Sequence, residues 1–388
     1  MKDTPVSVRL DATLSTLFGV TLMAVLGVSS ITPAFPLIVR ELGITPGQVG
    51  LLVSVFTIPG VLFSPVAGVL ADRLGRRRVL APALFLFGLA GAACGFSGSF
   101  SVLLALRFFQ GVGASALGVL VPTIISDIYD GWERTVALGY NASVLSIGTA
   151  SYPIAGGALA MIGWRYPFML PIFALPIGLA VIFRMRNPEP ENHQPFGLYI
   201  RSAAGTLRSP RVAGLFIIGI MSFVILYGSY LTYLPFLLDK RFGSSSFVIG
   251  LIMSTTSIST ALVSSRIGFF VRQCGENRLL GVGFALYGIG MLLMPFMPVA
   301  GMFVLPTAIY GAGMGLNNPC IQSLLGAQAP REHRAAFMSL FSMMLRIGQT
   351  IGPLVMGMVY MCCGVDAVFY AGAICAAVMV AVTVALVR

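Results

Sequence analysis

The densest cluster of charge in the sequence lies at residues 68–80, which read GVLADRLGRRRVL. Five charged side chains fall between Asp72 and Arg78, although only 10% of the 388 residues are charged. Such a cluster could bind nucleic acid or phosphate, lie passively on a membrane surface, or form part of a moving gate. In a gate, the Asp72 carboxylate could cap the N-terminus of a facing helix, where a negative charge is favoured. Gly68 and Gly75 suit a gate too, since small residues permit close helix contacts and tight turns.

The composition decides what kind of protein carries this cluster. Hydrophobic residues make up 57% of the chain, and the mean hydropathy is +0.92. A soluble protein of this length would need more polar residues to cover its surface. A helix of roughly 20 apolar residues crosses a bilayer and satisfies its own backbone hydrogen bonds. We therefore expect an all-α polytopic protein in a lipid bilayer. The net charge of +11 does not indicate nucleic acid, because the charges lie in short loops.

The apolar segments predict twelve transmembrane helices in two six-helix, pseudo-symmetric halves. The longest stretch that is not apolar, residues 184–211, lies between the sixth and seventh segments. We therefore expect an N-terminal bundle at 1–184, a cytoplasmic linker at 185–210 and a C-terminal bundle at 211–388. The predicted spans are about 14–39, 47–71, 78–99, 101–126, 134–162, 165–184, 211–238, 246–271, 278–298, 300–326, 334–361 and 365–387.

The basic residues set the expected orientation, because cytoplasmic loops carry the excess of Lys and Arg. About 17 of the 24 lie in the termini, the linker and the even-numbered loops. Both termini are therefore expected on the cytoplasmic side of the cell (inner) membrane. Three arginines remain within predicted spans: Arg107, Arg266 and Arg346. The odd-numbered loops carry Arg40, Arg165, Lys240 and Arg241.

The two halves are repeats, because an offset of 200 residues aligns them with almost no gaps. Glycine widens and proline narrows the backbone conformations that a residue can adopt. A long series of both at matching positions therefore indicates that the two halves share one fold. Two parallel six-helix halves around a central path are the layout of a transporter that binds its cargo near the midplane and alternates access. A duplicated membrane scaffold or receptor is the alternative. The aligned pairs include Gly50 with Gly250, Gly68 with Gly268, Gly75 with Gly275, Gly111 with Gly311, Pro153 with Pro353 and Gly157 with Gly357.

Four motifs fall in this frame. They are the charged stretch at 68–78, Arg107-Phe-Phe-Gln110-Gly111 in span four, the glycine series at 139–157 in span five, and Leu26-Gly27 with Pro33 and Pro36 in span one. Together they resemble the major facilitator superfamily, in particular its twelve-span drug:proton antiporter branch. The resemblance covers the whole chain and implies a secondary active transporter, without enzymatic activity or a cofactor, that works as a monomer. The span-five and span-one motifs favour proton-coupled efflux of amphipathic drugs or small molecules.

The resemblance implies roles for the charged residues. In the family the stretch after span two latches the cytoplasmic side against the eleventh helix, and Arg76 would pair with Asp127 at the end of span four. Asp72, Arg107 and Asp127 are the candidates for proton coupling. The alternatives are that the stretch only sets topology and that Arg107 snorkels to the outer surface. The expected gate residues are Gly68, Asp72, Arg73, Gly75, Arg76 and Asp127.

The second half changes the charges of this stretch. Arg272 stands where the first half has Asp72, and Glu276 stands where it has Arg76. We therefore expect an asymmetric latch centred on Asp72.

Span five carries the residues that resemble the antiporter motif, which marks exporters in the family. Its glycines and its proline predict a bendable helix packed at the interface of the halves. One position departs from the family pattern, which has glycine before the proline where this chain has tyrosine. The expected hinge residues are Gly148, Tyr152, Pro153, Gly156 and Gly157.

A polar stripe on span eleven predicts the lining of the substrate cavity. Ser339, Ser342, Arg346, Gln349 and Pro353 are spaced 3, 4, 3 and 4 residues apart, which places them on one helical face. Arg346 lies roughly 18 Å into the span at 1.5 Å per residue, near mid-bilayer. The alternative is a structural arginine that binds carbonyls of a neighbouring helix. The cavity candidates are Arg346, Gln349, Ser342, Asn317, Asn318, Tyr230 and Tyr233.

The predicted spans lack an acidic residue near their middle. A cavity with positive charge and no acid favours an anionic or zwitterionic substrate. The second hypothesis is therefore a transporter of an anionic metabolite or lipid-like amphiphile organised by Arg346. The expected partners are a small-molecule substrate, protons and the bilayer, with no nucleic acid. No metal site is expected, because the six cysteines lack metal-ligand spacing.

Overall fold

The computed structural model describes residues 11–185, 209–328 and 334–386. These residues form a bundle of helices with no β-strand among them. Nine helical segments in this part of the chain are long and apolar enough to cross a membrane. The all-α polytopic fold predicted from composition is thus confirmed, whereas the count of twelve spans stays a prediction. The linker predicted at 185–210 lies almost entirely outside the described residues.

The helices of the first half begin and end within a few residues of the predicted spans. Elements labelled η in this half are 3-10 helices. In chain order they are α1 (Ala12–Ser29), η1 (Thr32–Ala34), α2 (Phe35–Leu42), α3 (Pro46–Leu74), α4 (Arg76–Cys94), α5 (Phe100–Ile128), α6 (Gly131–Ala160), η2 (Tyr166–Phe173) and α7 (Ala174–Arg184).

The second half repeats this order with two irregularities, a π-helix in the seventh span and a break in the eighth. The π-helix is η3, whereas η4 and η5 are 3-10 helices. The elements are α9 (Pro210–Phe223), η3 (Val224–Leu231), α10 (Thr232–Phe242), α11 (Ser246–Ser265), α12 (Ile267–Cys274), α13 (Glu276–Leu293), η4 (Met294–Phe296), η5 (Ala300–Phe303), α14 (Val304–Gln328), α15 (Arg334–Cys363) and α16 (Val365–Leu386).

Helix ends fall where the sequence supplies capping and turning residues. Asp11 caps α1 by accepting a hydrogen bond from the Leu14 backbone N–H at 2.7 Å. Gly75 turns the chain between α3 and α4 with φ of 93°, and Gly275 turns it between α12 and α13 with φ of 76°. Only glycine adopts such values without strain, so the aligned glycines make equivalent turns in the two halves.

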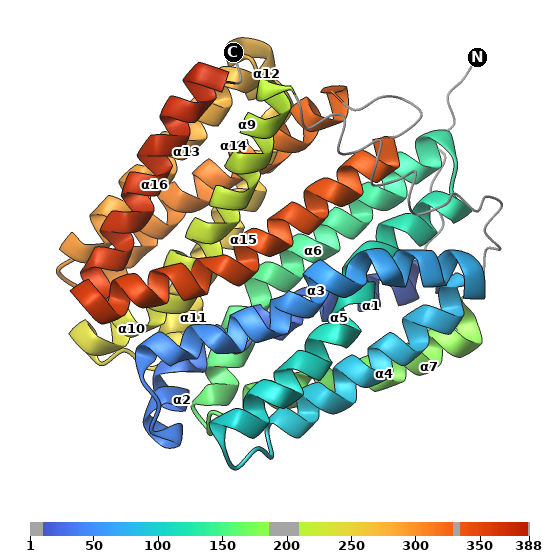
Figure 1. The fold of residues 1–388 in the computed structure, drawn as a ribbon, viewed down its shortest axis with the longest axis horizontal. Coiled ribbons are helices and arrows are strands. Elements are labelled where there is room, and N and C mark those ends of the chain that lie inside the picture. The colour runs from blue at the N-terminus through green and yellow to red at the C-terminus, as the bar shows by residue number, and fades with distance from the viewer. Residues whose placement is uncertain (1–10, 186–208, 329–333, 387–388) are drawn as a thin grey trace.

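The two halves lie side by side and meet along two pairs of helices. In Figure 1 α4, α5 and α7 of the first half lie at the lower right, and α9, α13, α14 and α16 of the second half lie at the upper left. Between them α3 lies along α15, and α6 packs on α11. The aligned positions of these helices in the repeat explain why the same contact occurs twice.

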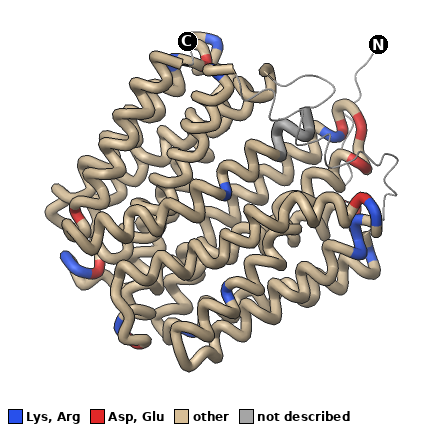
Figure 2. The backbone as a smooth tube through the Cα atoms, in the orientation of Figure 1, with Lys and Arg blue, Asp and Glu red and all other residues tan. Residues whose placement is uncertain are grey.

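Charged residues gather at the two ends of the bundle, and few lie between (Figure 2). Arg107 and Arg346 lie inside the long helices α5 and α15, as predicted. Arg266 does not lie inside a long helix, and its place within a span stays a prediction. It occupies the break between α11 and α12 and is exposed. The short α12 that follows has no fully buried residue, although Ile267, Phe270 and Val271 pack against the core.

Candidate functional site

The interface between the halves contains one backbone contact made twice. We call the end of the bundle with the turns at 43–45 and 243–245 the outer end, and the end with Gly75 and Gly275 the inner end. A Cβ built on Gly50 of α3 would approach the Pro353 carbonyl oxygen of α15 within 2.9 Å. A Cβ on Gly250 of α11 would overlap the Pro153 carbonyl of α6. Each contact is the image of the other at an offset of 200, and glycine permits the close approach.

The residues of the expected hinge motif lie along the contacts of α6 with both α1 and α11. A Cβ on Gly148 would lie 3.0 Å from a Leu22 methyl of α1 and 3.3 Å from the Tyr152 ring. Farther along α6, Gly156 lies against the Ser30 carbonyl, and Gly157 lies against the Ser246 carbonyl of the other half. The motif therefore places α6 in backbone contact with its own half and with its partner half. Tyr152 is partly buried and its ring lies beside Gly148. It directly precedes Pro153, whose carbonyl contacts Gly250.

Polar contacts continue this interface toward the middle of the bundle. The Ser54 hydroxyl donates to the Thr350 carbonyl at 2.7 Å, and the Thr57 and Thr350 hydroxyls are 2.9 Å apart. On the second helix pair the Ser257 hydroxyl donates to the Thr149 carbonyl at 3.1 Å. These hydrogen bonds join the two halves in this conformation.

An ion pair joins the halves at the outer end. Nη2 of Arg40, on α2, lies 2.8 and 2.6 Å from the two carboxylate oxygens of Asp239, on α10. The Arg40 side chain is 61% exposed, so the pair lies at the surface. Sequence reasoning missed this pair, although both residues precede equivalent turning glycines, Gly43 and Gly243.

The halves separate toward the inner end. From outer to inner, α3 meets α15 at Gly50, Ser54, Thr57 and Gly60. Two turns farther on, a Cβ on Gly68 would have no neighbour within 4 Å. The close helix approach expected at Gly68 is therefore absent from this conformation. In Figure 1 α3 and α15 diverge toward this end. The described residues therefore join the two halves at the end that we call outer, and α3 and α15 lie farther apart at the other end (Figure 1).

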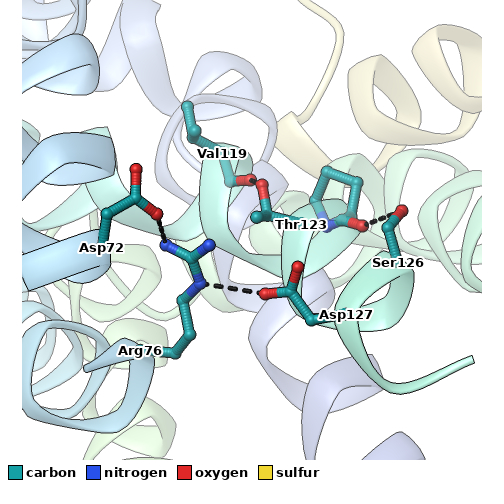
Figure 3. Close-up of polar contacts among 7 residues, drawn as sticks. Asp72, Arg76, Val119, Thr123, Ser126 and Asp127 are labelled. Atoms are coloured by element: carbon teal, nitrogen blue, oxygen red, sulfur yellow. Dashed lines mark hydrogen bonds and ion pairs between the residues drawn. The ribbon is translucent and has the colours of Figure 1, made fainter. Parts of the chain in front are cut away.

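Three charged residues of the expected gate form one cluster at the inner end (Figure 3). Arg76 starts α4, and its side chain is 7% exposed. Its Nε donates to Oδ2 of Asp127 at 3.0 Å, and its Nη1 pairs with Oδ1 of Asp72. The cluster ties α3, α4 and the end of α5 together within the first half. Arg73 is exposed at the end of α3.

The second half makes a different contact at the equivalent place. Oε1 of Glu276 accepts a hydrogen bond from the Ser323 hydroxyl at 2.6 Å, and Arg272 is exposed. The inner ends of the two halves therefore differ in their contacts as well as in their charges.

Arg107 is fully buried inside the first half. Its Nη1 donates to the Gly27 carbonyl of α1 at 2.8 Å and to Oε1 of Gln110 at 2.7 Å. Its Nε donates to the Leu52 carbonyl of α3 at 3.1 Å, and its guanidinium lies 4.2 Å from the centre of the Phe56 ring. The side chain therefore points into the bundle, and the alternative that it snorkels to the outer surface is wrong.

Arg346 lies at the boundary of the halves. A Cβ on Gly60 of α3 would overlap its Nη1, and a Cβ on Gly118 of α5 would lie 3.2 Å from its Nη2. Along the same face of α15, Gln349 is partly exposed and Ser342 is exposed. Ser342, Arg346 and Gln349 thus share one face of α15. No motif in the sequence indicated that Gly60 and Gly118 would contact the guanidinium.

The remaining cavity candidates lie apart from Arg346. Tyr230 is 1% exposed, donates to the Met253 carbonyl at 3.1 Å and stacks on Tyr310, all within the second half. Tyr233 is fully buried and stacks on Tyr360. Asn317 is buried against Gly283 of α13, and Asn318 is partly exposed. In this conformation the two tyrosines and Asn317 belong to the packing of the second half.

Comparisons with known proteins agree with this architecture. A family model described as Major Facilitator Superfamily matches residues 17–245 and 237–388. The chain is 28% identical over 379 residues to multidrug resistance protein 1 of Bacillus subtilis (strain 168), covering 97% of this chain and 96% of that protein. It is 26% identical over 360 residues to the bacillibactin exporter of the same organism, covering 87% of each. The structure of nucleoside transporter NupG superimposes with a TM-score of 0.81 at 17% identity, covering 97% of this chain and 98% of that one, and supports the fold.

Proposed function

Because the chain belongs to the major facilitator superfamily, and is therefore a multi-pass membrane transporter rather than an enzyme, we propose that it exports amphipathic small molecules in exchange for protons. Two similar proteins are named for multidrug resistance and for the export of bacillibactin. Their similarity favours efflux over uptake.

The observation that carries the transport mechanism is the repeated glycine–carbonyl contact at Gly50 and Gly250. Both contacts involve backbone atoms, so the halves can pivot about them without rearranging side chains. With the outer end closed and the inner end parted, cargo would enter the cavity from the inner side. Closing the inner end and parting the outer end would then release it, which is the rocking expected of two repeated bundles.

The carboxylates at the inner end are the proposed route of proton coupling. Asp72 and Asp127 are 41% and 30% exposed, so water reaches both, and both contact the same arginine. Protonating either one would weaken its pairing with Arg76 and change how the inner end closes. Arg107 remains a candidate, but its hydrogen bonds to two backbone carbonyls favour a role in holding α1, α3 and α5 together.

Reconstitution into liposomes tests this function. The purified protein would face an imposed pH gradient, and the movement of a cationic dye, a neutral amphiphile and an anionic amphiphile would be followed by fluorescence. We expect at least one of them to accumulate against its gradient while the pH gradient lasts, and to leak back when nigericin collapses that gradient. Movement of all three that ignores the pH gradient would contradict proton exchange.

A further inference from the structure

The guanidinium of Arg346 extends from the second half into a notch in the first. The notch is formed by Gly60 of α3 and Gly118 of α5, two helices that pack against each other. A Cβ on Gly60 would overlap Nη1 and lie 3.0 Å from both Cδ and Cζ of the arginine. Any larger residue at Gly60 would push the charged group out of the notch. Both halves therefore fix where this charge lies.

The charge of Arg346 has no acidic partner among the described residues. The ion pairs in that part of the chain are Arg40–Asp239, Arg76–Asp72, Arg76–Asp127 and Arg241–Asp366. The guanidinium also has no hydrogen bond within the described residues, unlike that of Arg107, whose Nε and Nη1 have three between them. A cation near mid-membrane without a partner is costly, so a group from outside the chain would be well placed to neutralise it.

The notch is accessible rather than sealed. Arg346 is partly exposed, and Gly118 is exposed although Leu117 and Leu120 beside it are buried. Ser342, one turn closer to the inner end on the same face as Arg346, is exposed as well. Ser342 and Arg346 therefore both have surface that a molecule approaching from the inner end can contact.

The surroundings suit an amphipathic molecule with an acidic group. Tyr227, on the π-helix η3, interacts electrostatically with Arg346, and its ring stacks on Phe223. Gln349 adds an amide one turn farther along α15. Guanidinium recognises carboxylate, sulfonate and phosphate oxygens through paired hydrogen bonds, and the ring supplies apolar contact.

We propose that Arg346, held in the notch of Gly60 and Gly118, binds the anionic group of the transported molecule, which makes the cargo an amphipathic organic anion. This inference rests on the proposed transport function and names its substrate class. Because the notch belongs to the first half and the arginine to the second, the anion binds where the two halves meet and senses their separation.

A pair of probes that differ only in charge tests the proposal. Dansyl-phenylalanine carries a carboxylate, and dansyl-phenylalaninamide is its uncharged match. Binding of each to the protein in lipid nanodiscs would be measured by fluorescence anisotropy, with empty nanodiscs subtracted. We expect the acid to bind about tenfold more tightly than the amide, as a desolvated charge-assisted pair allows.

The variants sharpen the result. Arg346→Gln should remove the preference for the acid, and Arg346→Lys should keep part of it. Gly60→Ala should reduce acid binding more than Gly118→Ala, since the first Cβ would overlap the guanidinium and the second would only touch it. Gly281→Ala in α13, where a Cβ would have no neighbour within 4 Å, is the matched control. Thermal unfolding of each variant checks that it is folded.

Two outcomes would overturn the proposal: an acid that binds wild type no more tightly than the amide, or a preference that survives in folded Arg346→Gln. Neither depends on protons, because binding is measured without a pH gradient. A protein that binds the acid through Arg346 but moves cargo without regard to pH would contradict proton exchange and leave the anion site standing.

Discussion

The carbonyl oxygen of Pro353 lies against Gly50, so close that a Cβ on the glycine would come within 2.9 Å of it. The image contact, Gly250 on Pro153, is closer still. A helix backbone cannot shift far to admit a methyl group at either place, because each contact sits among long packed helices. Both contacts join the two halves near the end that this structure holds closed.

We expect Gly250→Ala to hinder closure of the outer end more than Gly50→Ala does. The added methyl would overlap the Pro153 carbonyl in the first variant and only crowd the Pro353 carbonyl in the second. Transport should fall in the same order, with Gly281→Ala close to wild type. The measurement is the rate at which a membrane-impermeant maleimide labels a cysteine introduced at Ser245, in a background where the exposed Cys274, Cys362 and Cys363 are replaced by serine. Faster labelling in Gly50→Ala than in Gly250→Ala would contradict the prediction.

The ion pair of Arg40 with Asp239 should bias the outer end toward closure. A pair this exposed contributes about 0–1 kcal/mol, so Asp239→Asn should raise outer labelling by only a few-fold and leave the melting temperature nearly unchanged. High salt should reduce the difference from wild type. Asp366→Asn is the control, since it breaks a similar pair, with Arg241 at 2.7 Å, that stays within the second half. If Asp239→Asn and Asp366→Asn were labelled at equal rates, the Arg40–Asp239 pair would have no role in gating.

Asp72→Asn should lower transport about tenfold while the protein still inserts and folds, because the amide loses a charge-assisted contact with Arg76 and cannot serve as a charged cap. Arg272→Ala, at the equivalent position of the second half, should have much less effect, since that side chain is exposed. Uptake by liposomes with equal amounts of each folded variant measures both. If Asp72→Asn and Arg272→Ala lose transport equally, the charged residues at 68–78 only set the orientation of the chain in the membrane.

Arg107→Met should destabilise the protein by about 3–5 kcal/mol, because it strands two carbonyls and Gln110 in a buried site. Arg107→Lys should lose less, since an ammonium can still reach one of these acceptors. Thermal unfolding in detergent gives the order of the variants. Per folded molecule, Arg107→Lys should keep transport driven by the pH gradient. Loss of that coupling at unchanged stability would assign the arginine to proton transfer instead.

Much of this arrangement follows from the repeat in the sequence. An offset of 200 aligns Gly50 with Gly250 and Pro153 with Pro353, and the structure joins each glycine to the proline of the other half. The pairing of Arg76 with Asp127 also appears in the structure as the resemblance implied. Such features are predictable because they depend on order along the chain and on residues that constrain the backbone.

Other features depend on which neighbour a helix face meets, and the sequence does not state that. A tyrosine at cavity spacing, such as Tyr230, can line a cavity or pack inward, and here a carbonyl and a second ring hold it inside the second half. The notch that receives Arg346 involves Gly60 and Gly118, which are far from it in sequence and marked by no motif. The break between α11 and α12 at Arg266 was likewise not predicted, because the apolar run continues past it in the sequence.

At the outer end the backbone of Gly250 packs against the carbonyl of Pro153, and this contact does not involve the residues proposed to bind cargo. If Arg346 recognises the cargo as proposed, closure and recognition depend on separate sets of positions. Under that proposal, substitutions at Ser342, Gln349 or Tyr227 would alter what is carried and leave the contacts at Gly50 and Gly250 unchanged. A transporter of this kind could acquire a new cargo by point mutation while it keeps the contacts about which its halves move.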